Sequence, residues 1–444
     1  MSADRPFAER RLHFVGIGGV GMSGLAIVAK ALGAEVTGSD HAESSYTARL
    51  RRHGVEPAAR HDATNLPDGA EVVVSSAIAA DNPELACARA VGARVLHRGE
   101  LLGEVSRLKR AIAVAGTHGK TTTGGMIAHA LAACGREPAF LIGGELRSAD
   151  ANAAWGEGEW IVVEADESDR SFLHLGRDVA VVTSVELDHH ATYRSLSELE
   201  AAFAEFAGPA GTRIAGPGVA LDGAVSYGID AGSWHADGLE LRPLGSRFAV
   251  EGVPVELRVP GRHNVLNALA ALAACEAAGL APAEAAPALA GFTGAGRRFE
   301  EWGLTASGAR VFDDYAHHPT EVRATLDAAR TLEPRRLVAC FQPHLYSRTR
   351  ELAREFGRAL ALADLAVVLE VYPARERRED FPGVSGLMVA QATADAAAGR
   401  PVWWIPSIDE AVDRLGAELR EGDVLLTLGA GDVDRLAAAL AGAA

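Results

Sequence analysis

Apolar and polar positions alternate in blocks along the chain, and these blocks predict strands and helices in regular succession. Residues 11–19 form an apolar run that ends in glycines, and residues 20–33 have helical spacing up to a terminal glycine. Short apolar runs at residues 34–40, 71–78 and 93–100 predict further strands. Because strands alternate with helices, we expect a parallel, doubly wound α/β sheet.

Two further α/β units follow. A buried strand from residue 111 leads through a tight glycine turn into a helix that runs to about Cys134, and two later apolar strands end in carboxylates. Residues 208–260 are rich in Gly and Pro, so we expect irregular β structure there. After residue 300, apolar runs alternate with helical segments again and predict a third α/β sheet. We therefore expect three domains, at residues 1–108, 109–294 and 295–444.

Composition narrows the class of protein. The 444 residues carry a net charge of −16 and no basic run longer than three, which argues against a nucleic-acid partner. No apolar run is long enough to span a membrane, and the N-terminus lacks the apolar core of a signal peptide. We expect a cytoplasmic protein with no membrane partner.

Lysine is scarce. The chain has only Lys30, Lys109 and Lys120, against 40 arginines. A retained lysine can mark a place where a compact ammonium matters, and Lys120 lies in a glycine turn between a strand and a helix. This makes Lys120 the first candidate for chemistry.

Two glycine turns could hold phosphates. Residues 16–21 read GIGGVG, a GxGxxG turn, with Asp40 closing the next strand, which suits a diphosphate and by itself would suggest NAD. Residues 116–123 read GTHGKTTT, in which backbone N–H groups, Lys120 and the Thr121 hydroxyl could hold phosphates and Mg²⁺. This second turn is a variant phosphate loop, because Val114 stands where the first glycine of the strict pattern belongs.

Carboxylates and histidines follow several predicted strands. Glu164 ends one strand, and residues 186–190, ELDHH, follow another in the same unit. Mg²⁺ prefers oxygen ligands together with substrate phosphates, so these strand ends favour ATP·Mg chemistry. In the third unit, DDYAHHPTE and FQPH place Tyr and His at strand ends, where they could hold a small carboxylate or base.

Together these segments closely resemble the Mur ligase family. The resemblance runs through nearly the whole chain and includes HFVGIGGVGMSGLA, AGTHGKTTT, VVEADESD, PGRHNVLNALAA, DDYAHHPTE, FQPH and LGAGD. It implies a Rossmann-like N-terminal domain for a UDP-sugar, a central P-loop ATPase-type α/β domain and a Rossmann-like C-terminal domain for an amino acid. It also reassigns the first glycine turn from NAD to uridine diphosphate.

The resemblance implies a reaction and its partners. Within the family the motifs are most similar to members that join L-alanine to the carboxylate of UDP-N-acetylmuramate, through an acyl phosphate, in peptidoglycan precursor synthesis. ATP and Mg²⁺ are the implied cofactors, and we expect a monomer or weak homodimer.

The family pattern also assigns residues. The phosphates of ATP fall to Gly116, Thr117, His118, Gly119, Lys120, Thr121, Thr122 and Arg298. His263, Asn264 and Asp314 are further implied contacts of the nucleotide. The UDP-sugar falls to Gly18, Gly19, Ser39, Ser76, His97 and Arg98, and the amino acid to Tyr315, His317, His344 and Arg348. Thr121, Glu164 and His189 are the implied metal ligands, and Lys120, Glu164 and His189 the implied catalytic residues.

The chain departs from the family pattern at three points. Several relatives carry a carbamylated lysine in the central domain, but this chain has no lysine after Lys120. Leu345 stands where the family often has an arginine, which removes one expected contact to the alanine carboxylate. Ala191 replaces an acidic residue or histidine that often follows the Asp-His pair.

Three other hypotheses stay open at this point. A recycling ligase of the same family would add a preformed tripeptide to the same nucleotide sugar. An NAD-dependent oxidoreductase would explain the first glycine turn but not the second. A non-catalytic nucleotide sensor could share the fold, although Lys120, Thr121, Glu164 and His189 argue for catalysis.

Overall fold

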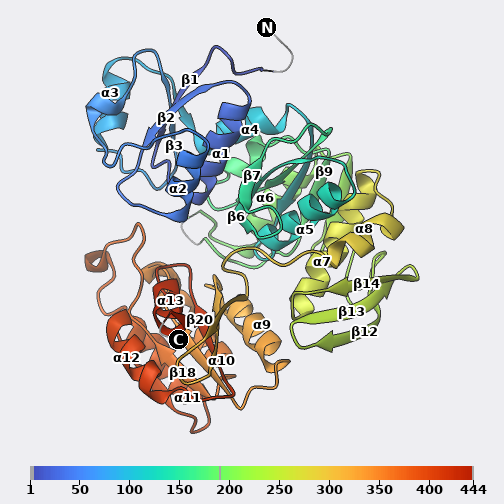
Figure 1. Cartoon of the computed structure of the whole chain (residues 1–444), viewed down its shortest axis with the longest axis vertical. Helices are drawn as coiled ribbons and strands as arrows, with labels where there is room; N and C mark the ends of the chain where they lie inside the picture. The colour runs from blue at the N-terminus through green and yellow to red at the C-terminus, as the bar shows by residue number, and fades with distance from the viewer. Residues whose placement is uncertain (1–4, 190–191, 443–444) are drawn as a thin grey trace. The chain divides into compact units, whose positions relative to one another are not determined.

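The computed structural model describes residues 5–189 and 192–442 (Figure 1). His190 and Ala191 therefore lie outside the described residues. Internal contacts divide the chain into two compact units. Unit 1 comprises Met1–Leu187, Arg194–His235 and Asn267–Leu289, and unit 2 comprises Asp188–Tyr193, Ala236–Leu266 and Ala290–Ala444.

Unit 1 begins with a four-stranded parallel sheet in the order β2-β1-β3-β4. Its strands are β1 (Arg11–Val15), β2 (Glu35–Ser39), β3 (Glu71–Val74) and β4 (Val95–His97). Its helices are α1 (Val20–Ala31), α2 (Ser45–Arg52), α3 (Pro83–Ala90) and α4 (Arg98–Ser106), with a short 3-10 turn η1 (Ala63–Asn65). Because chain direction along the sheet reverses at β1, the carboxyl end of β1 is a switch point where ligands commonly bind.

The second sheet of unit 1 has seven strands in the order β11-β10-β9-β5-β8-β6-β7, and only β7 runs antiparallel to its neighbour. The strands are β5 (Arg110–Ala115), β6 (Ala139–Leu146), β7 (Ala151–Ala154), β8 (Trp160–Glu164), β9 (Val179–Val182), β10 (Thr212–Ala215) and β11 (Val225–Ser226). They connect through α5 (Lys120–Ala133), η2 (Ser171–His174) and α6 (Leu196–Ala207), and α8 (Pro282–Leu289) completes the unit. The buried strand β5 lies in the middle, so the loop after it is held by neighbours on both sides.

Unit 2 contains two sheets. A three-stranded antiparallel sheet is formed by β12 (Asp237–Arg242), β13 (Gly245–Val250) and β14 (Val253–Leu257). Helix α7 (Arg262–Ala277) follows it, and its residues from Asn267 onward belong to unit 1. A six-stranded sheet has the order β15-β16-β20-β17-β18-β19. Its strands are β15 (Glu300–Leu304), β16 (Arg310–Asp314), β17 (Arg336–Phe341), β18 (Leu365–Val368), β19 (Val402–Trp404) and β20 (Asp423–Leu428). Its helices are α9 (Pro319–Arg330), α10 (Tyr346–Leu360), α11 (Gly386–Ala396), α12 (Ile408–Glu418) and α13 (Asp434–Ala441), with η3 (Arg378–Asp380) between α10 and α11.

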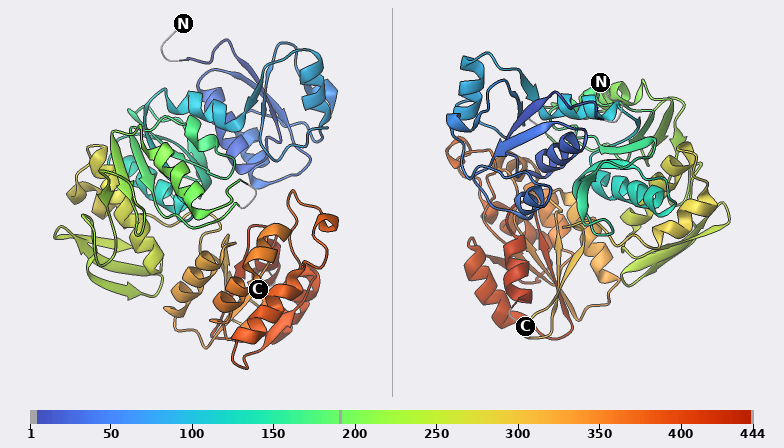
Figure 2. Two further views of the ribbon diagram at one scale, coloured as in Figure 1. Left: turned by 180° about the vertical axis from the view of Figure 1, so that it is seen from behind. Right: turned by 45° about the horizontal axis from the view of Figure 1, so that its top comes forward.

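Helices cover both faces of the six-stranded sheet (Figures 1 and 2). Alternate strand residues, such as Leu337 and Phe341, pack with α9, α10 and α11 in one core cluster. The residues between them, such as Val338 and Cys340, pack with α12 and α13 in another. A strand buried on both faces must be apolar throughout, which is why RLVACF and DVLLTL carry almost continuous hydrophobic runs.

The structure confirms the predicted α/β class and most predicted elements. At residues 208–260 the expected β structure is present, but it is more regular than predicted and forms the short strands β10 to β14. Strands β6, β7 and β15 were not predicted, because their glycines and polar residues hide the strand pattern, and cross-strand pairing makes them regular. The three-domain boundaries stay a prediction.

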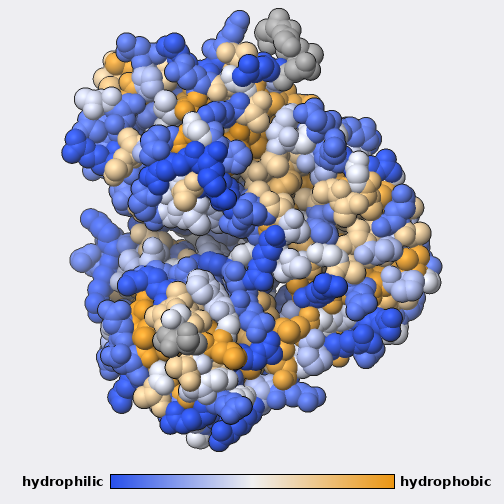
Figure 3. Space-filling model, in the orientation of Figure 1, coloured by the Kyte–Doolittle hydropathy of each residue, from blue (hydrophilic) through white to orange (hydrophobic). Residues whose placement is uncertain are grey.

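Among the described residues, no helix is both long and apolar enough to cross a membrane. The face of the molecule in Figure 3 is mostly hydrophilic, with hydrophobic residues scattered between polar ones.

Candidate active site

The loop between β5 and α5 has the geometry of a phosphate-binding turn. Gly116 has a φ of 126°, and a Cβ added there would lie 2.1 Å from Oγ1 of Thr183. Any other residue at this position would therefore clash with the neighbouring strand end. Helix α5 begins directly at Lys120, so the first N–H groups of a 14-residue helix face the loop.

Lys120 is held at the mouth of this loop. Its Nζ donates to the carbonyl oxygens of Gly116 at 2.6 Å and Thr117 at 3.3 Å, and to the carboxylate of Glu167 at 3.0 Å. Burial lowers the pKa of the Lys120 ammonium, but the nearby carboxylates, Glu167 foremost, outweigh burial and raise this pKa above its ordinary value. Lys120 is therefore a fixed positive charge, the form that binds terminal phosphates.

Thr121 and Glu164 supply oxygen donors beside the lysine. The Thr121 hydroxyl donates to Oε2 of Glu164 at 2.9 Å, and the same oxygen accepts the N–H of Gly143 at 2.7 Å. Glu164 ends β8, which pairs with β5 in register with Val114. One hydroxyl and one carboxylate at this spacing fit the oxygen-rich coordination that Mg²⁺ requires.

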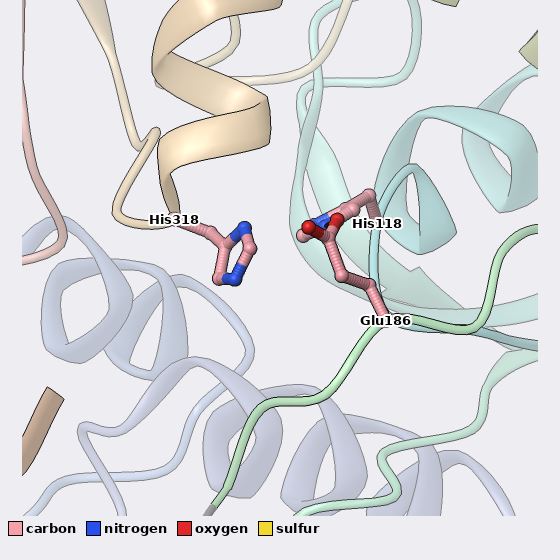
Figure 4. Close-up of side chains that lie close together, drawn as sticks. All are labelled: His118, Glu186 and His318. Carbon is pink, nitrogen blue, oxygen red and sulfur yellow. Dashed lines mark hydrogen bonds and ion pairs between the residues drawn. The ribbon is translucent and has the colours of Figure 1, made fainter. Parts of the chain in front are cut away.

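A second set of contacts stiffens the phosphate loop from the side of β9. Thr117 exchanges hydrogen bonds with the backbone of Glu186, donating through Oγ1 at 3.0 Å and accepting from the N–H at 2.9 Å. Nε2 of His118 lies 2.8 Å from the Glu186 carboxylate, and the two side chains point toward each other in Figure 4. Glu186 was not among the predicted site residues, since only the fold brings it to His118.

The N-terminal glycine turn is organised by Asp40. The N–H of Gly18 donates to Oδ2 of Asp40 at 2.9 Å, and a Cβ on Gly18 would lie 2.9 Å from that oxygen. Asp40 thus fixes the turn itself. Gly19 is the N-cap of α1, so the adjacent helix N-terminus can receive an anion.

A buried polar cluster lies at the end of β2. The Ser39 hydroxyl donates to Glu84 at 2.5 Å, and Nδ1 of His61 lies 2.8 Å from the same hydroxyl. Burial raises the pKa of Glu84, but hydrogen bonds from His13, Ser39 and other donors outweigh burial and lower this pKa to about 2. Ser39 was predicted, whereas Glu84, on α3, was not.

The other predicted UDP-sugar residues lie at strand ends of the same unit. Nε2 of His97 lies 3.4 Å from Asp169, and Nδ1 of His97 accepts the N–H of Gly99. Nη2 of Arg98 lies 3.4 Å from Asp166, and its guanidinium packs against Gly21 in the first turn of α1. Ser76 is exposed in the turn after β3. The Arg98 side chain therefore lies against the N-terminal glycine turn.

In unit 2, aromatic rings line the carboxyl ends of β16, β17 and β18. The ring centroids of Tyr315 and His317 lie 5.4 Å apart, those of His317 and His344 6.0 Å, and those of His344 and Tyr372 5.9 Å. Tyr372 was not predicted, because nothing in its local sequence separates it from a core tyrosine. Three of these four rings are predicted amino-acid residues, so the structure does bring them together.

Two residues predicted to contact the nucleotide, Arg298 and Asp314, lie near the carboxyl end of β16. Asp314 accepts the N–H groups of Phe299 and Ala316, each at 2.8 Å, and burial raises its pKa to about 6. The Arg298 guanidinium carbon lies 5.1 Å above the Tyr315 ring.

His263 and Asn264 begin α7. Burial lowers the pKa of His263 to about 4, so its imidazole is neutral, and Nδ2 of Asn264 donates to the Pro260 carbonyl at 2.8 Å. His189 has a φ of 53°, and its backbone N–H donates to Oδ1 of Asp188 at 2.7 Å.

Comparison with known proteins decides the family. Three family models match consecutive parts of the chain: "Mur ligase family, catalytic domain" at residues 11–110, "Mur ligase middle domain" at 114–275 and "Mur ligase, glutamate ligase domain" at 297–431. A relative from Acidithiobacillus ferrooxidans, named UDP-N-acetylmuramate–L-alanine ligase, is 44% identical over 97% of both chains. The chain belongs to the Mur ligase family.

Further relatives and solved structures support the same family assignment. Relatives of the same name are 48% identical in Kineococcus radiotolerans, over 95% of this chain and 94% of that one, and 45% identical in Streptomyces coelicolor, over 98% of each. The solved structure of UDP-N-acetylmuramate-alanine ligase from Thermotoga maritima matches with a TM-score of 0.83 and 31% identity, covering 96% of this chain and 97% of that one. A murein peptide ligase from Psychrobacter arcticus matches with a TM-score of 0.70 and 25% identity, covering 97% and 99%. Membership of the Mur ligase family makes the NAD-dependent oxidoreductase hypothesis wrong.

Proposed function

We propose that this chain joins L-alanine to the carboxylate of UDP-N-acetylmuramate, while ATP is converted to ADP and phosphate. The observation that carries this proposal is the 44–48% identity, over nearly the full length, to relatives named for that reaction. The murein peptide ligase is the less similar of the two solved structures compared above, which favours alanine over a tripeptide as the added group.

The first step transfers the γ-phosphoryl group of ATP to a carboxylate oxygen of the sugar, which forms an acyl phosphate and releases ADP. Lys120 would neutralise charge on the transferring group, and the loop N–H groups would hold the phosphates. Thr121 and Glu164, with His189 as a further candidate, would hold Mg²⁺, which would supply additional positive charge to the phosphate oxygens.

In the second step the amine nitrogen of L-alanine attacks the acyl carbon. The C–O bond to phosphate breaks, phosphate leaves with the bonding electrons, and the nitrogen loses a proton. The amino acid would be oriented by Tyr315, His317, His344 and Arg348. Holding it in a near-attack geometry removes much of the entropic barrier.

The remaining assignments belong to the same proposal. The uridine diphosphate would bind at the N-terminal glycine turn through Gly18, Gly19, Ser39, Ser76, His97 and Arg98. The phosphates of ATP would contact Gly116, Thr117, His118, Gly119, Thr122 and Arg298, and the nucleotide would also contact His263, Asn264 and Asp314. The reaction would serve peptidoglycan synthesis in the cytoplasm.

The test is ligation with purified protein, ATP, Mg²⁺ and UDP-N-acetylmuramate. L-Alanine, L-serine, glycine, D-glutamate and the tripeptide are offered separately, and phosphate release and product mass are both recorded. We expect a product heavier by one alanine residue, with one phosphate released for each amide. Turnover with the tripeptide alone would replace the alanine proposal with the recycling reaction.

Two lysine variants distinguish a catalytic protein from a nucleotide sensor. Lys120→Ala should lower the ligation rate by about a hundred- to a thousandfold, because it removes one fixed charge from the transition state. Lys30→Ala is the matched control, since Lys30 only donates to the carbonyl of Gly54 at an exposed position. Equal rates for the two variants would contradict the assignment of Lys120.

A further inference from the structure

Asp188 and Arg348 form a buried ion pair in unit 2, although they are 160 positions apart in the sequence. Oδ1 of Asp188 accepts from Nε at 3.2 Å and from Nη2 at 3.1 Å, and Oδ2 accepts from Nη2 at 3.0 Å. Asp188 is 5% exposed and Arg348 is 4% exposed. A fork this buried fixes the orientation of the whole guanidinium.

The remaining side of the guanidinium faces His344. Nη1 of Arg348 lies 3.2 Å from Nδ1 of His344 and 3.4 Å from its carbonyl oxygen. An arginine can only donate, so Nδ1 of His344 must accept and the proton of the neutral ring must be on Nε2. Nε and Nη2 of Arg348 thus contact Asp188 and Nη1 contacts His344, so these two residues together set the position of the guanidinium.

We propose that Asp188 is a positioning residue which, through Arg348, holds His344 as the Nε2–H tautomer, so that this imidazole donates to the carboxylate of the amino-acid substrate. This inference rests on the proposed function for the identity of the substrate. It gives Asp188 a role in orienting the amino-acid pocket, and it makes the His344 imidazole a donor to the substrate carboxylate.

The neighbouring histidine has the opposite tautomer. Nδ1 of His317 lies 3.0 Å from the carbonyl oxygen of Tyr315, which can only accept, so Nδ1 carries the proton and Nε2 is an acceptor. Two adjacent imidazoles thus offer one donor and one acceptor. A free amino acid carries one acceptor group, its carboxylate, and one donor group, its ammonium, so this pair matches both ends.

Both rings are uncharged near neutral pH, which the tautomer argument requires. Burial lowers the pKa of His344 to about 3, and the positive charges of Arg348 and Arg375 act in the same direction. Burial also lowers the pKa of His317 to about 4. Tyr372 stacks on the His344 ring with an interplanar angle of 12° and supports its orientation.

The kinetic test compares Asp188→Asn with a control variant of another Arg–Asp fork. Asp423→Asn removes the buried carboxylate that pairs with the half-buried Arg336 where β17 and β20 begin. We expect Asp188→Asn to raise the KM for L-alanine about 10- to 100-fold, the cost of one misplaced charge-assisted hydrogen bond, and to leave the KM for ATP unchanged. Asp423→Asn should change neither. An unchanged KM for L-alanine in Asp188→Asn would overturn the proposal.

A second measurement needs no turnover. Long-range ¹⁵N–¹H spectra of histidine-labelled protein distinguish protonated from unprotonated ring nitrogens, and the loss of one signal set in His344→Gln assigns His344. We expect an Nε2–H ring in the wild type and mixed tautomers in Asp188→Asn. Arg348→Lys should give the same mixture of His344 tautomers. This variant replaces Asp188→Asn in the test if Asp188→Asn does not fold. An Nδ1–H or charged His344 in the wild type would overturn the positioning role.

The two measurements separate this inference from the proposed function. If the wild type ligates no amino acid but His344 shows the Asp188-dependent tautomer, the proposed reaction fails and the positioning role stands. If L-alanine is ligated but the tautomer does not depend on Asp188, the reaction stands and the positioning role fails.

Discussion

The ammonium of Lys120 lies 3.0 Å from both carboxylate oxygens of Glu167, a side chain that is 1% exposed. The two residues are 47 positions apart, on the loops that follow the neighbouring strands β5 and β8. Glu167 is the largest of the charge interactions that raise the pKa of Lys120. The phosphate loop therefore carries its own counterion, which keeps the lysine charged and in place while no nucleotide is bound.

Replacement of this counterion should slow phosphoryl transfer without unfolding the protein. Glu167→Gln keeps the shape but removes the charge, so we expect the rate of phosphate release to fall about 10- to 100-fold. Single-turnover phosphate release measures this step. Glu159→Gln, an exposed change just before β8, should have no effect. An unchanged rate in Glu167→Gln would mean that Lys120 needs no partner to stay in position.

The hydroxyl of Thr121 should set the requirement for Mg²⁺. Thr121→Val preserves volume but removes the oxygen that lies 2.9 Å from Glu164. The Mg²⁺ concentration at half-maximal phosphate release should rise about tenfold, because this change corresponds to the free energy of one lost polar interaction. Thr393→Val is the control, because the hydroxyl of Thr393 only donates to the Val389 carbonyl of its own helix. Equal Mg²⁺ dependence in the two variants would remove Thr121 from the metal site.

The N-terminal turn should tolerate no side chain at Gly18. An alanine Cβ would lie 2.9 Å from Oδ2 of Asp40 and 2.9 Å from Cγ2 of Thr47, so the turn would have to open. We expect Gly18→Ala to raise the KM for UDP-N-acetylmuramate at least about tenfold, because the backbone N–H groups lose their arrangement. Gly416→Ala, in α12 with its nearest neighbour 3.6 Å away, should leave this KM unchanged. A normal KM in Gly18→Ala would place the diphosphate elsewhere.

Glu84 should make the stability of the first sheet depend on pH. Its pKa falls from an ordinary value of 4.5 to about 2 in the folded protein, so its ionised form stabilises the fold at every pH above 4.5. This stabilisation, about 3 kcal/mol from the size of the shift, is lost as the pH falls from 4.5 toward 2.

Urea unfolding at a series of pH values tests this prediction. The difference between the wild type and Glu84→Gln should be greatest at neutral pH and should shrink below pH 4.5. Glu410→Gln, at an exposed position on α12, should unfold like the wild type at each pH. A difference that stays constant with pH would show that Glu84 contributes by packing and not by its charge.

Local patterns explain why much of the fold and of the phosphate loop could be predicted. Strand β5, the glycine turn and α5 are contiguous, and the period of their apolar residues changes from strand to helix within a few positions. Lys120 and Thr121 lie within this contiguous segment, so the local pattern alone marks them as candidates. Their candidate roles could therefore be inferred before any contact was known.

The missed residues depend on contacts between distant segments. Glu167, Glu186 and Asp188 belong to acidic clusters in which the sequence does not distinguish a ligand from a counterion. Tyr372 contributes only because β18 lies beside β17, and strand order cannot be read from periodicity. Strand β15 has a polar pattern, and its regularity comes from pairing with β16 at the edge of the sheet. Tertiary geometry supplies each of these assignments.

The scarcity of lysine has a practical consequence. An amine-reactive acylating reagent meets only three lysines, and their settings differ: Lys30 is half-buried beside Gly54, Lys109 lies over the Trp155 ring, and Lys120 is inside the phosphate loop. An acylating reagent attacks only the neutral amine, so Lys120, which is charged and paired with Glu167, would react more slowly than the other two. A chemical tag would therefore enter at Lys30 and Lys109 first and leave the phosphate loop unmodified.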